Sequence, residues 1–428
     1  MYLENVYVNI LLSNYNTYIF NKLLLNEFIT ENINMKKLNF NRRKFLKYTA
    51  TTATGIGLLP GFPKNAFASN KTLADEAKDS EVKYKQNPDD PRIKFSVIGI
   101  NHGHIYSQVD AVIRGGGQLV SLYAKEPELV AAFTKKYPQV KLASGEKEIL
   151  EDKSIQLILS AAIPVDRAGI GIRSMQHGKD YMGDKPGITS LEQLAEVRRI
   201  QKQTGRIYSI MYSERFENKA TVKAGDLVKA GAIGKVIQTI GLGPHRMNAG
   251  TRPEWFFDRK YFGGIITDIG SHQFDQFLYF TNSDNASIVS SQTANAAHPQ
   301  YPNFEDFGDV MIRGNGGTGY IRVDWFTPDG LKTWGDGRLT ILGTEGYIEV
   351  RKNIDIAGRE GGSHLFVVNG KDTQYIDCSN VDLPYGKQLV DDIINRTETA
   401  MTQKHCFLAT ELALKAQKNA QKINFKKN

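Results

Sequence analysis

The sequence predicts an α/β protein in two parts, with a parallel sheet in the first and an open, mostly antiparallel sheet in the second. Between residues 92 and 182, short apolar strands alternate with segments of helical periodicity, which is typical of βαβ units. After about residue 212, strands follow one another through Gly-rich turns, which is typical of antiparallel pairing. The length of 428 residues suits two domains with additional segments.

The N-terminal 68 residues have the order of segments found in export signals. Arg42 and Arg43 form a twin-arginine pair, a weakly apolar stretch follows at 48–59, and Ala66-Phe67-Ala68 matches an A-x-A cleavage site. The apolar stretch is too short to span about 30 Å of hydrocarbon. We therefore expect export to the periplasm by the twin-arginine route, and no stable membrane insertion after cleavage.

Charge and cysteine content narrow the classes of partner. Residues 1–68 carry a net charge of +5, so only +3 of the total of +8 belongs to the rest of the chain. A nearly balanced remainder argues against a nucleic-acid partner. The two cysteines, Cys378 and Cys406, are too few for a metal cluster by themselves and could be either paired or free.

The first domain is expected at residues 92–216, after a polar linker at 69–91. Its alternating elements predict a parallel sheet with helices between the strands, the Rossmann arrangement that binds dinucleotides. The expected strands lie at 93–99, 118–124, 156–162 and 180–182, and the expected helices at 104–114, 127–137 and 167–177.

The second domain is expected at residues 217–428, as an α+β domain. One helix is expected at 219–230, another at 272–280 between two strands, and an amphipathic helix at 407–420. The expected strands lie at 235–243, 286–296, 307–313, 318–326, 337–342, 346–351 and 364–368.

The turn after the first strand is a modified dinucleotide fingerprint. That fingerprint, G-x-G-x-x-G, lets the backbone approach a diphosphate at the N-terminus of the next helix. Gly99 is in phase, whereas Asn101 and His104 occupy the other two glycine positions and Gly103 is displaced by one. Asparagine tolerates the left-handed conformation, so the turn can still form. A plain tight turn is the alternative.

The end of the second strand bears on the form of the cofactor. An acidic residue is usual there, because it binds the ribose hydroxyls. The sequence has Ala124, which cannot accept a hydrogen bond, followed by Lys125. Lys125 could pair with a 2′-phosphate, which would favour NADP, or it could be an ordinary solvated lysine.

A lysine before a proline follows the short strand at 180–182. In Asp184-Lys185-Pro186 the proline ring holds Lys185 in an extended conformation, so its ammonium can point from the edge of the sheet into a cleft. The alternative is a surface lysine in a turn.

The segment 263–275 carries the strongest chemical pattern. Asp268 and His272 are four residues apart, so a helical turn would place both on one face. A histidine beside a carboxylate can act as a general base, because the carboxylate orients the ring and raises its pKa. The alternative is a structural histidine in a capped helix. A metal site would need a third ligand at a diagnostic spacing, and none is found, so we expect no metal ion.

Taken together, the turn at 93–114, the Asp-Lys-Pro at 184–186 and the G-G-x-x-x-D-x-G-x-H-x-x-D at 263–275 resemble the glucose–fructose oxidoreductase/inositol dehydrogenase/rhizopine-catabolism (Gfo/Idh/MocA) family. The resemblance covers about residues 92–425. It implies oxidation or reduction of a sugar or cyclitol hydroxyl with NAD or NADP, and a homo-oligomer that uses the open sheet. Asp184 stands where the family usually has Glu.

The resemblance also implies roles for individual residues. Lys185 corresponds to the family lysine that touches substrate and nicotinamide, and Asp268 and His272 correspond to its Asp/His pair, with His272 as the base. The residues expected to contact the cofactor are Gly99, Asn101, His102, Gly103, His104, Lys125, Ala162, Pro164, Lys185 and Pro186. The residues expected to bind substrate are Tyr212, Arg215, His245, Arg246, Trp255 and Arg259.

The expected function is therefore a periplasmic oxidoreductase that holds its NAD(P) tightly and acts on a carbohydrate. Two alternatives remain from the sequence. One is an exported glycosidase that uses bound NAD for transient oxidation. The other is a non-catalytic sugar-binding protein that kept the fold.

Overall fold

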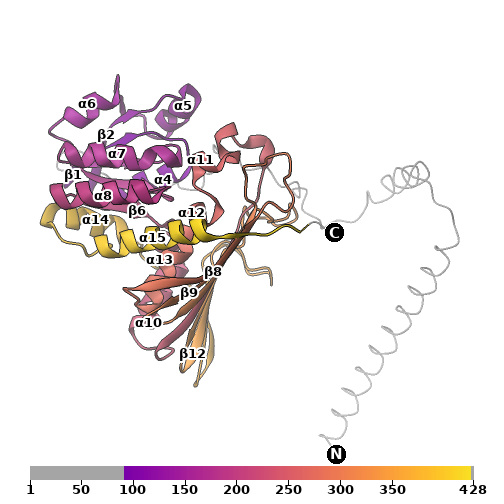
Figure 1. The fold of residues 1–428 in the computed structure, drawn as a ribbon. Helices are drawn as coiled ribbons and strands as arrows, with labels where there is room; N and C mark the ends of the chain where they lie inside the picture. Colours follow the sequence, from indigo (N-terminus) through magenta and orange to yellow (C-terminus); the bar gives the residue numbers. More distant parts are fainter. Residues whose placement is uncertain (1–90, 426–428) are drawn as a thin grey trace, which may run out of the picture. The chain divides into compact units, whose positions relative to one another are not determined.

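The computed structural model describes residues 91–425, so the twin-arginine segment and most of the predicted linker lie outside the described residues. The described chain contains a six-stranded sheet and a nine-stranded sheet. Figure 1 shows the first sheet surrounded by helices, and the second fanning out from it. In residues 91–425, none of the helices is long and apolar enough to cross a membrane.

The six-stranded sheet is entirely parallel, with the order β3-β2-β1-β4-β5-β6. This order reverses between β1 and β4, where doubly wound sheets form a crevice at the carboxyl ends of their strands. The strands are β1 Ile93–Ile98, β2 Gly117–Tyr123, β3 Lys141–Leu142, β4 Leu157–Ser160, β5 Asp180–Asp184 and β6 Tyr208–Met211. The helices are α4 His104–Arg114, α5 Pro127–Lys136, α6 Glu146–Glu151, α7 Pro164–Gln176 and α8 Leu191–Thr204.

The chain reaches the second sheet through short helices and loops. These elements are α9 Ser213–Phe216, α10 Lys219–Lys229, the 3-10 turns Ala249–Thr251 and Glu254–Phe257, α11 Arg259–Phe262, α12 Ile265–Asp268 and α13 Gly270–Thr281. Helix α13 is covered almost completely, because it lies between the second sheet and α15, Gln403–Asn419.

The nine-stranded sheet is mixed, with the order β14-β13-β12-β11-β7-β10-β9-β8-β15. Only the pairs β7–β10 and β8–β15 are parallel, so the expectation of a mostly antiparallel sheet is confirmed. The strands are β7 Val236–Pro244, β8 Ala286–Ala294, β9 Phe307–Gly314, β10 Thr318–Asp324, β11 Arg338–Gly343, β12 Gly346–Arg351, β13 His364–Asn369, β14 Thr373–Ile376 and β15 Gln421–Lys422.

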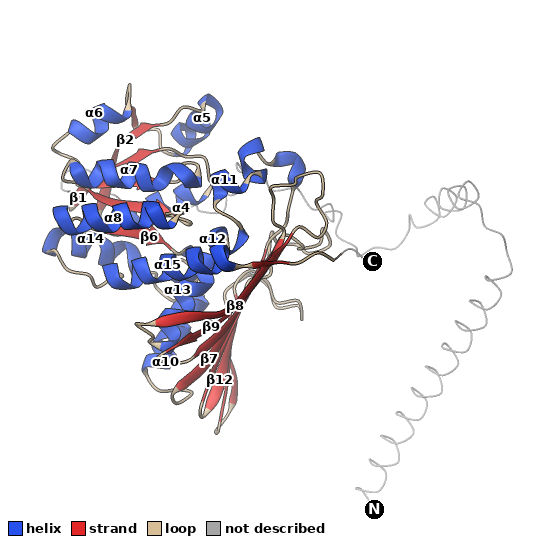
Figure 2. Cartoon of the chain, viewed as in Figure 1, coloured by secondary structure: helices blue, strands red, loops and turns tan. Residues whose placement is uncertain are grey.

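One face of the nine-stranded sheet is packed against helices. Helix α13 lies on β7 and β10, and α10 lies on β12 and β13. Figure 2 shows the strands spread as a single curved layer beside these helices. Several strands also carry exposed apolar side chains, namely Ile237, Val289, Met311, Leu342 and Tyr347.

Two C-terminal helices return to the parallel sheet. Helix α14, Tyr385–Asn395, packs on α4, while α15 packs on α8, α12 and α13. The sequence predicts α15 but not α14, although α14 has a clear apolar face. The two C-terminal helices therefore pack against the elements that carry the candidate site and hold them together. Both cysteines are buried and free, which settles the alternative that the sequence leaves open.

The contact of α14 with α4 depends on a glycine. A Cβ atom at Gly386 would lie 1.8 Å from the carbonyl oxygen of Ala111, which is far inside the van der Waals distance. We therefore expect Gly386→Ala to lower the free energy of unfolding by about 1–3 kcal/mol, measured by urea denaturation. Gly370→Ala is the matched control, because nothing lies within 4 Å of its Cβ position. Equal effects of the two substitutions would contradict this packing.

Candidate active site

The turn between β1 and α4 fits the diphosphate of a dinucleotide. Gly99 has a φ of +79°, and a Cβ atom there would lie 2.6 Å from the Cβ of Ala162, so only glycine allows this approach of two turns. Helix α4 begins at His104 with no side-chain cap and no acidic residue in its first turn. The N–H groups of Ile105 and Tyr106 already donate to the carbonyl oxygens of His102 and Gly103 at 3.2 Å, so an anion here would rely mainly on the positive end of the helix dipole.

A carboxylate that the sequence analysis missed lies beside this turn. The Asn101 side chain donates a hydrogen bond of 2.7 Å to Glu126, which follows the second strand three residues after Tyr123. The predicted residue, Lys125, is exposed, and its backbone N–H donates to the same carboxylate at 3.2 Å. In this fold an acidic residue at the end of the second strand usually accepts hydrogen bonds from the ribose hydroxyls. Glu126 lies near that position, three residues after the end of β2.

Asp184, at the end of β5, has three hydrogen-bonding side chains around its carboxylate. The Nδ1 atoms of His102 and His104 lie 2.7 Å and 2.9 Å from its two carboxylate oxygens. The guanidinium of Arg167 lies 3.1 Å from one of these oxygens. Burial raises the pKa of Asp184, but Arg167 and the histidines overcome this and hold the pKa well below its usual value. Asp184 is therefore a buried anion whose neighbours compensate its charge.

Arg167 fixes the backbone that carries the candidate lysine. Its guanidinium donates to the carbonyl oxygen of Ala162 at 2.7 Å, to that of Lys185, and to that of Pro186 at 3.3 Å. The predicted cofactor residue Pro164 begins α7, the helix that carries Arg167. Nothing in the sequence distinguishes Arg167 from a surface arginine on an amphipathic helix.

Lys185 and Asp268 form a buried ion pair. The Lys185 Nζ atom lies 3.1 Å from Asp268 Oδ1, and both residues are at most 9% exposed. Burial would raise the pKa of Asp268, but the ammonium of Lys185 outweighs it and lowers that pKa. The fold thus brings together two residues that are 83 positions apart in the chain.

His272 lies in the same region but is not hydrogen-bonded to Asp268. Its ring is buried, and its Nδ1 atom has no partner in the described chain. The expected orientation of His272 by Asp268 is therefore wrong, because the charged ammonium of Lys185 holds that carboxylate instead. Burial lowers the pKa of His272 to about 4, so its imidazole is neutral at pH 7.

A second buried ion pair lies close to His272. Lys352 contacts the carboxylate of Glu214, which also accepts hydrogen bonds from Gln273 at 2.8 Å and Gln276 at 3.2 Å. Burial would raise the pKa of Glu214, but Lys352 and then His272 lower it well below its usual value. The negative charge of Glu214 in turn opposes the fall of the His272 pKa. The sequence gives no signal for this pair, since Lys352 follows β12 and is 138 positions from Glu214.

Two of the predicted substrate residues, Tyr212 and His245, lie in or near this region, whereas Trp255 lies in the segment before α11. The Tyr212 ring is 6.2 Å from the His272 ring, and its hydroxyl lies 3.3 Å from the Thr410 hydroxyl. His245 places Nδ1 3.1 Å from the carbonyl oxygen of Gly243, and burial followed by Lys185 lowers its pKa to about 3. Trp255 is half-buried in a 3-10 turn beside Phe256.

The three predicted arginines have other partners. Arg215 is buried in a bidentate ion pair with Asp275, which occupies the Nε and Nη2 edge of its guanidinium. Arg246 donates to backbone carbonyls of Pro328 and Leu331, so it holds a loop. Their expected role in gripping substrate is therefore not supported.

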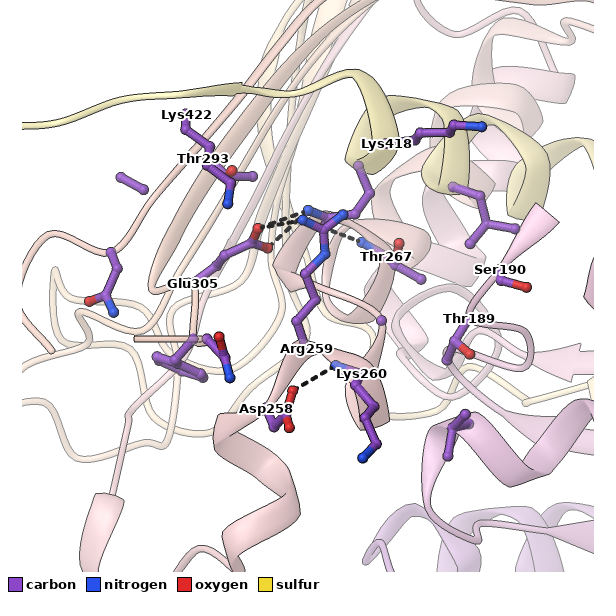
Figure 3. Close-up of a pocket in the computed structure, with 18 of the residues that line it drawn as sticks. Thr189, Ser190, Asp258, Arg259, Lys260, Thr267, Thr293, Glu305, Lys418 and Lys422 are labelled. Carbon is purple, nitrogen blue, oxygen red and sulfur yellow. Dashed lines mark hydrogen bonds and ion pairs between the residues drawn. The ribbon is translucent and has the colours of Figure 1, made fainter. Parts of the chain in front are cut away.

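The third arginine, Arg259, lines a separate cavity. Figure 3 shows its guanidinium directed at Glu305, 3.4 Å away, with Thr267 on the same wall. The cavity has a volume of about 970 Å³ and is lined by α8, α11, β8 and α15. Lys185, Asp268 and His272 are not among its lining residues, although Thr267 precedes Asp268 in the chain. Arg259 is thus near the ion pair in sequence but faces another space.

Comparison with known proteins identifies relatives of this chain in sequence and fold. Residues 221–349 match the family model described as the GFO/IDH/MocA C-terminal domain. A crystal structure from Erwinia carotovora atroseptica SCRI1043, described as an oxidoreductase, is 47% identical, with 78% of this chain and all of that chain covered and a TM-score of 0.76. Levoglucosan dehydrogenase in complex with NADH and levoglucosan is 17% identical over 76% of this chain and 95% of that chain, with a TM-score of 0.63.

A curated relative matches a smaller part of the chain. The scyllo-inositol 2-dehydrogenase (NAD(+)) of Bacillus subtilis (strain 168) is 26% identical over 226 residues, which are 50% of this chain. The match spans 62% of the length of that relative.

The Glu214–Lys352 pair yields a stability prediction. We expect Glu214→Gln to lower the free energy of unfolding at pH 7 by about 3–5 kcal/mol, because it leaves a buried ammonium without a counter-charge. The double variant Glu214→Gln/Lys352→Met should recover much of the loss in urea denaturation. Since the Glu214 pKa is lowered by folding, its contribution is present above about pH 4.3 and is lost as the pH falls through the folded pKa. A double variant no more stable than Glu214→Gln would contradict the pairing.

The six-stranded parallel sheet and the nine-stranded sheet together form a fold that these solved structures share. The Erwinia structure is covered over its whole length at high identity, and the family model matches the second sheet. The chain belongs to the Gfo/Idh/MocA family.

Proposed function

We propose that the protein is an NAD(P)-dependent oxidoreductase that acts on a CH–OH group of a sugar, cyclitol or sugar derivative. The observation that carries this proposal is the buried Lys185–Asp268 pair, which lies with the neutral imidazole of His272 at the carboxyl edge of the parallel sheet. The family membership and the NAD-dependent inositol dehydrogenase among the relatives support it.

The residues around the site divide the reaction into proton transfer and charge stabilisation. Bound NAD(P) supplies the acceptor or donor of the hydride at the carbinol carbon. His272 is neutral at pH 7, so one of its ring nitrogens can take the hydroxyl proton. Lys185 can donate a hydrogen bond to the oxygen as it becomes an alkoxide. Asp268 acts on Lys185 and holds its ammonium in place.

Among the two nucleotides, we propose NAD as the preferred cofactor. Glu126 lies against Asn101 of the glycine turn, where its carboxylate can accept hydrogen bonds from ribose hydroxyls. The same negative charge would repel a 2′-phosphate, although the exposed Lys125 next to it weakens this effect. The NAD-dependent inositol dehydrogenase supports the same choice.

The proposed location follows from the twin-arginine segment at residues 41–68. This route carries folded proteins, so the cofactor can be inserted before export and must then be held tightly. We propose a periplasmic protein that retains its nucleotide through the catalytic cycle.

A homo-oligomer is part of this proposal. The apolar side chains Ile237, Met311, Leu342 and Tyr347 are exposed on strands of the nine-stranded sheet. Exposed apolar side chains on one sheet favour association. We propose that a second copy of the chain covers it.

The cofactor proposal predicts a bound nucleotide. Protein purified from the periplasm without added nucleotide should release NAD on denaturation, which liquid chromatography with mass spectrometry identifies. Glu126→Ala should shift the preference of the stripped protein towards NADP, because the carboxylate that repels the 2′-phosphate is gone. Protein that neither contains nor binds a nicotinamide nucleotide would overturn the proposal.

The catalytic proposal predicts a pattern of rates. With a panel of sugars and cyclitols, followed by absorbance of the reduced nucleotide, His272→Asn and Lys185→Met should each lower kcat/KM by about 10²–10⁴-fold. The value of kcat/KM should fall as the pH drops through about 4, where His272 becomes protonated. His177→Asn serves as the control, because that exposed histidine only caps the end of α7. Undiminished rates in both active-site variants would contradict the assigned roles.

A further inference from the structure

The two histidines of the glycine turn converge on one buried carboxylate. His102 and His104 place their Nδ1 atoms 2.7 Å and 2.9 Å from Asp184, and their ring centroids are 4.1 Å apart. Potential ligand atoms of the three residues all lie within 4.8 Å of one another. A dinucleotide turn has no need of this arrangement, since its fingerprint places glycine where His104 stands.

We propose that His102, His104 and Asp184 bind one divalent transition-metal ion, with zinc preferred. Two imidazole nitrogens and one carboxylate oxygen are ligands that zinc accepts, and three protein ligands leave a position open for water or another ligand. Asp268 and His272 have no third metal ligand at a diagnostic spacing in the sequence. The structure assembles a different set, from two turns that are about 80 residues apart.

The geometry is close to that of a zinc site. Two ligand atoms at about 2.0–2.1 Å from a tetrahedral zinc ion are about 3.3 Å apart. The observed N–O separations of 2.7 Å and 2.9 Å correspond to hydrogen bonds in which each Nδ1 carries a proton. When the ion binds, each neutral imidazole carries its proton on Nε2 in place of Nδ1, so that Nδ1 can ligate, and the ligands separate by about 0.5 Å. The two histidine side chains are 28–29% exposed, so an ion can reach them from solvent.

The residues around the three ligands fix their positions but lower their affinity for a metal ion. Asp184 is held by Arg167, as outer partners commonly hold the carboxylates of metal sites. The positive charge of Arg167 repels a metal ion. The Asp184 carboxylate nevertheless has lone pairs that remain available to bind the ion. The other buried cations nearby, Lys185 and Lys352, have their own carboxylates. We therefore expect an exchangeable ion that a chelator removes, and we expect no permanently bound one.

This site extends the proposed function without resting on it. The His104 ring lies 6.4 Å from that of His272, so the ion is adjacent to the proposed base. Metal binding can be measured with nucleotide-free protein and without turnover. A failure of the metal proposal is thereby distinguishable from a failure of the oxidoreductase proposal.

The test is zinc binding by untagged mature protein. After treatment with EDTA, the protein is dialysed to equilibrium against zinc chloride, and bound zinc is measured by inductively coupled plasma mass spectrometry. We expect about one zinc ion per chain. His102→Ala and His104→Ala should each lower the affinity by roughly tenfold or more. The matched control His177→Ala should bind like the unaltered chain, because His177 is exposed on α7 and contacts only the carbonyl of Arg173.

Two further measurements keep the result interpretable. Cobalt in place of zinc should give visible absorption bands that both histidine variants lose. Zinc should raise the Tm of the unaltered chain and of His177→Ala but not of the other two variants. A cooperative melting transition in His102→Ala and His104→Ala shows that these two variants are folded. No zinc bound at saturation, or equal binding by His102→Ala, His104→Ala and the unaltered chain, would overturn the proposal and leave these residues as a hydrogen-bond network.

Discussion

The ion pair between Lys185 and Asp268 is the interaction on which the candidate site depends. It joins the end of β5 in the parallel sheet to the end of α12, which leads into the helix carrying His272. Both groups are buried, so neither could stay charged there alone without a large cost in desolvation. Their pairing places an ammonium, which can stabilise a developing negative charge, next to a neutral imidazole.

The same principle accounts for the other charges in this part of the chain. Arg167 compensates Asp184, and Lys352 compensates Glu214. Because each carboxylate has its own cation, the nearby histidines gain little stabilisation of their charged forms, and burial lowers the pKa of His102, His245 and His272. The result is a group of neutral imidazoles between fixed charges, which suits proton acceptance and metal binding alike.

The sequence was informative where a pattern is local. The alternation of strands and helices predicts the parallel sheet, and the Gly-rich turns predict the antiparallel strands of the second sheet. The spacing of Asp268 and His272 assigns both to the helical segment of α12 and α13, although Asp268 pairs with Lys185. The Lys-Pro pair locates Lys185 only through its resemblance to a family motif, and the structure then brings it to Asp268.

The sequence was uninformative where partners come from distant elements. Arg167 and Lys352 look like ordinary helix and strand residues, and only tertiary packing brings them to Asp184 and Glu214. For the same reason the partner of Asp268 was misassigned, since a neighbour four residues away was preferred to a lysine 83 residues away. Arg215 shows the reverse error, because its charge suggested substrate binding while a buried partner, Asp275, already occupies it.

The central claim is that Asp268 acts on Lys185, while Glu214 sets the environment of His272. Nuclear magnetic resonance titration of the His272 imidazole in Asp268→Asn and in Glu214→Gln tests this most directly. Glu214 raises the pKa of His272, so Glu214→Gln should lower that pKa below its value of about 4, whereas Asp268→Asn should change it much less. A larger fall in Asp268→Asn than in Glu214→Gln would contradict the account and restore Asp268 as the partner of His272.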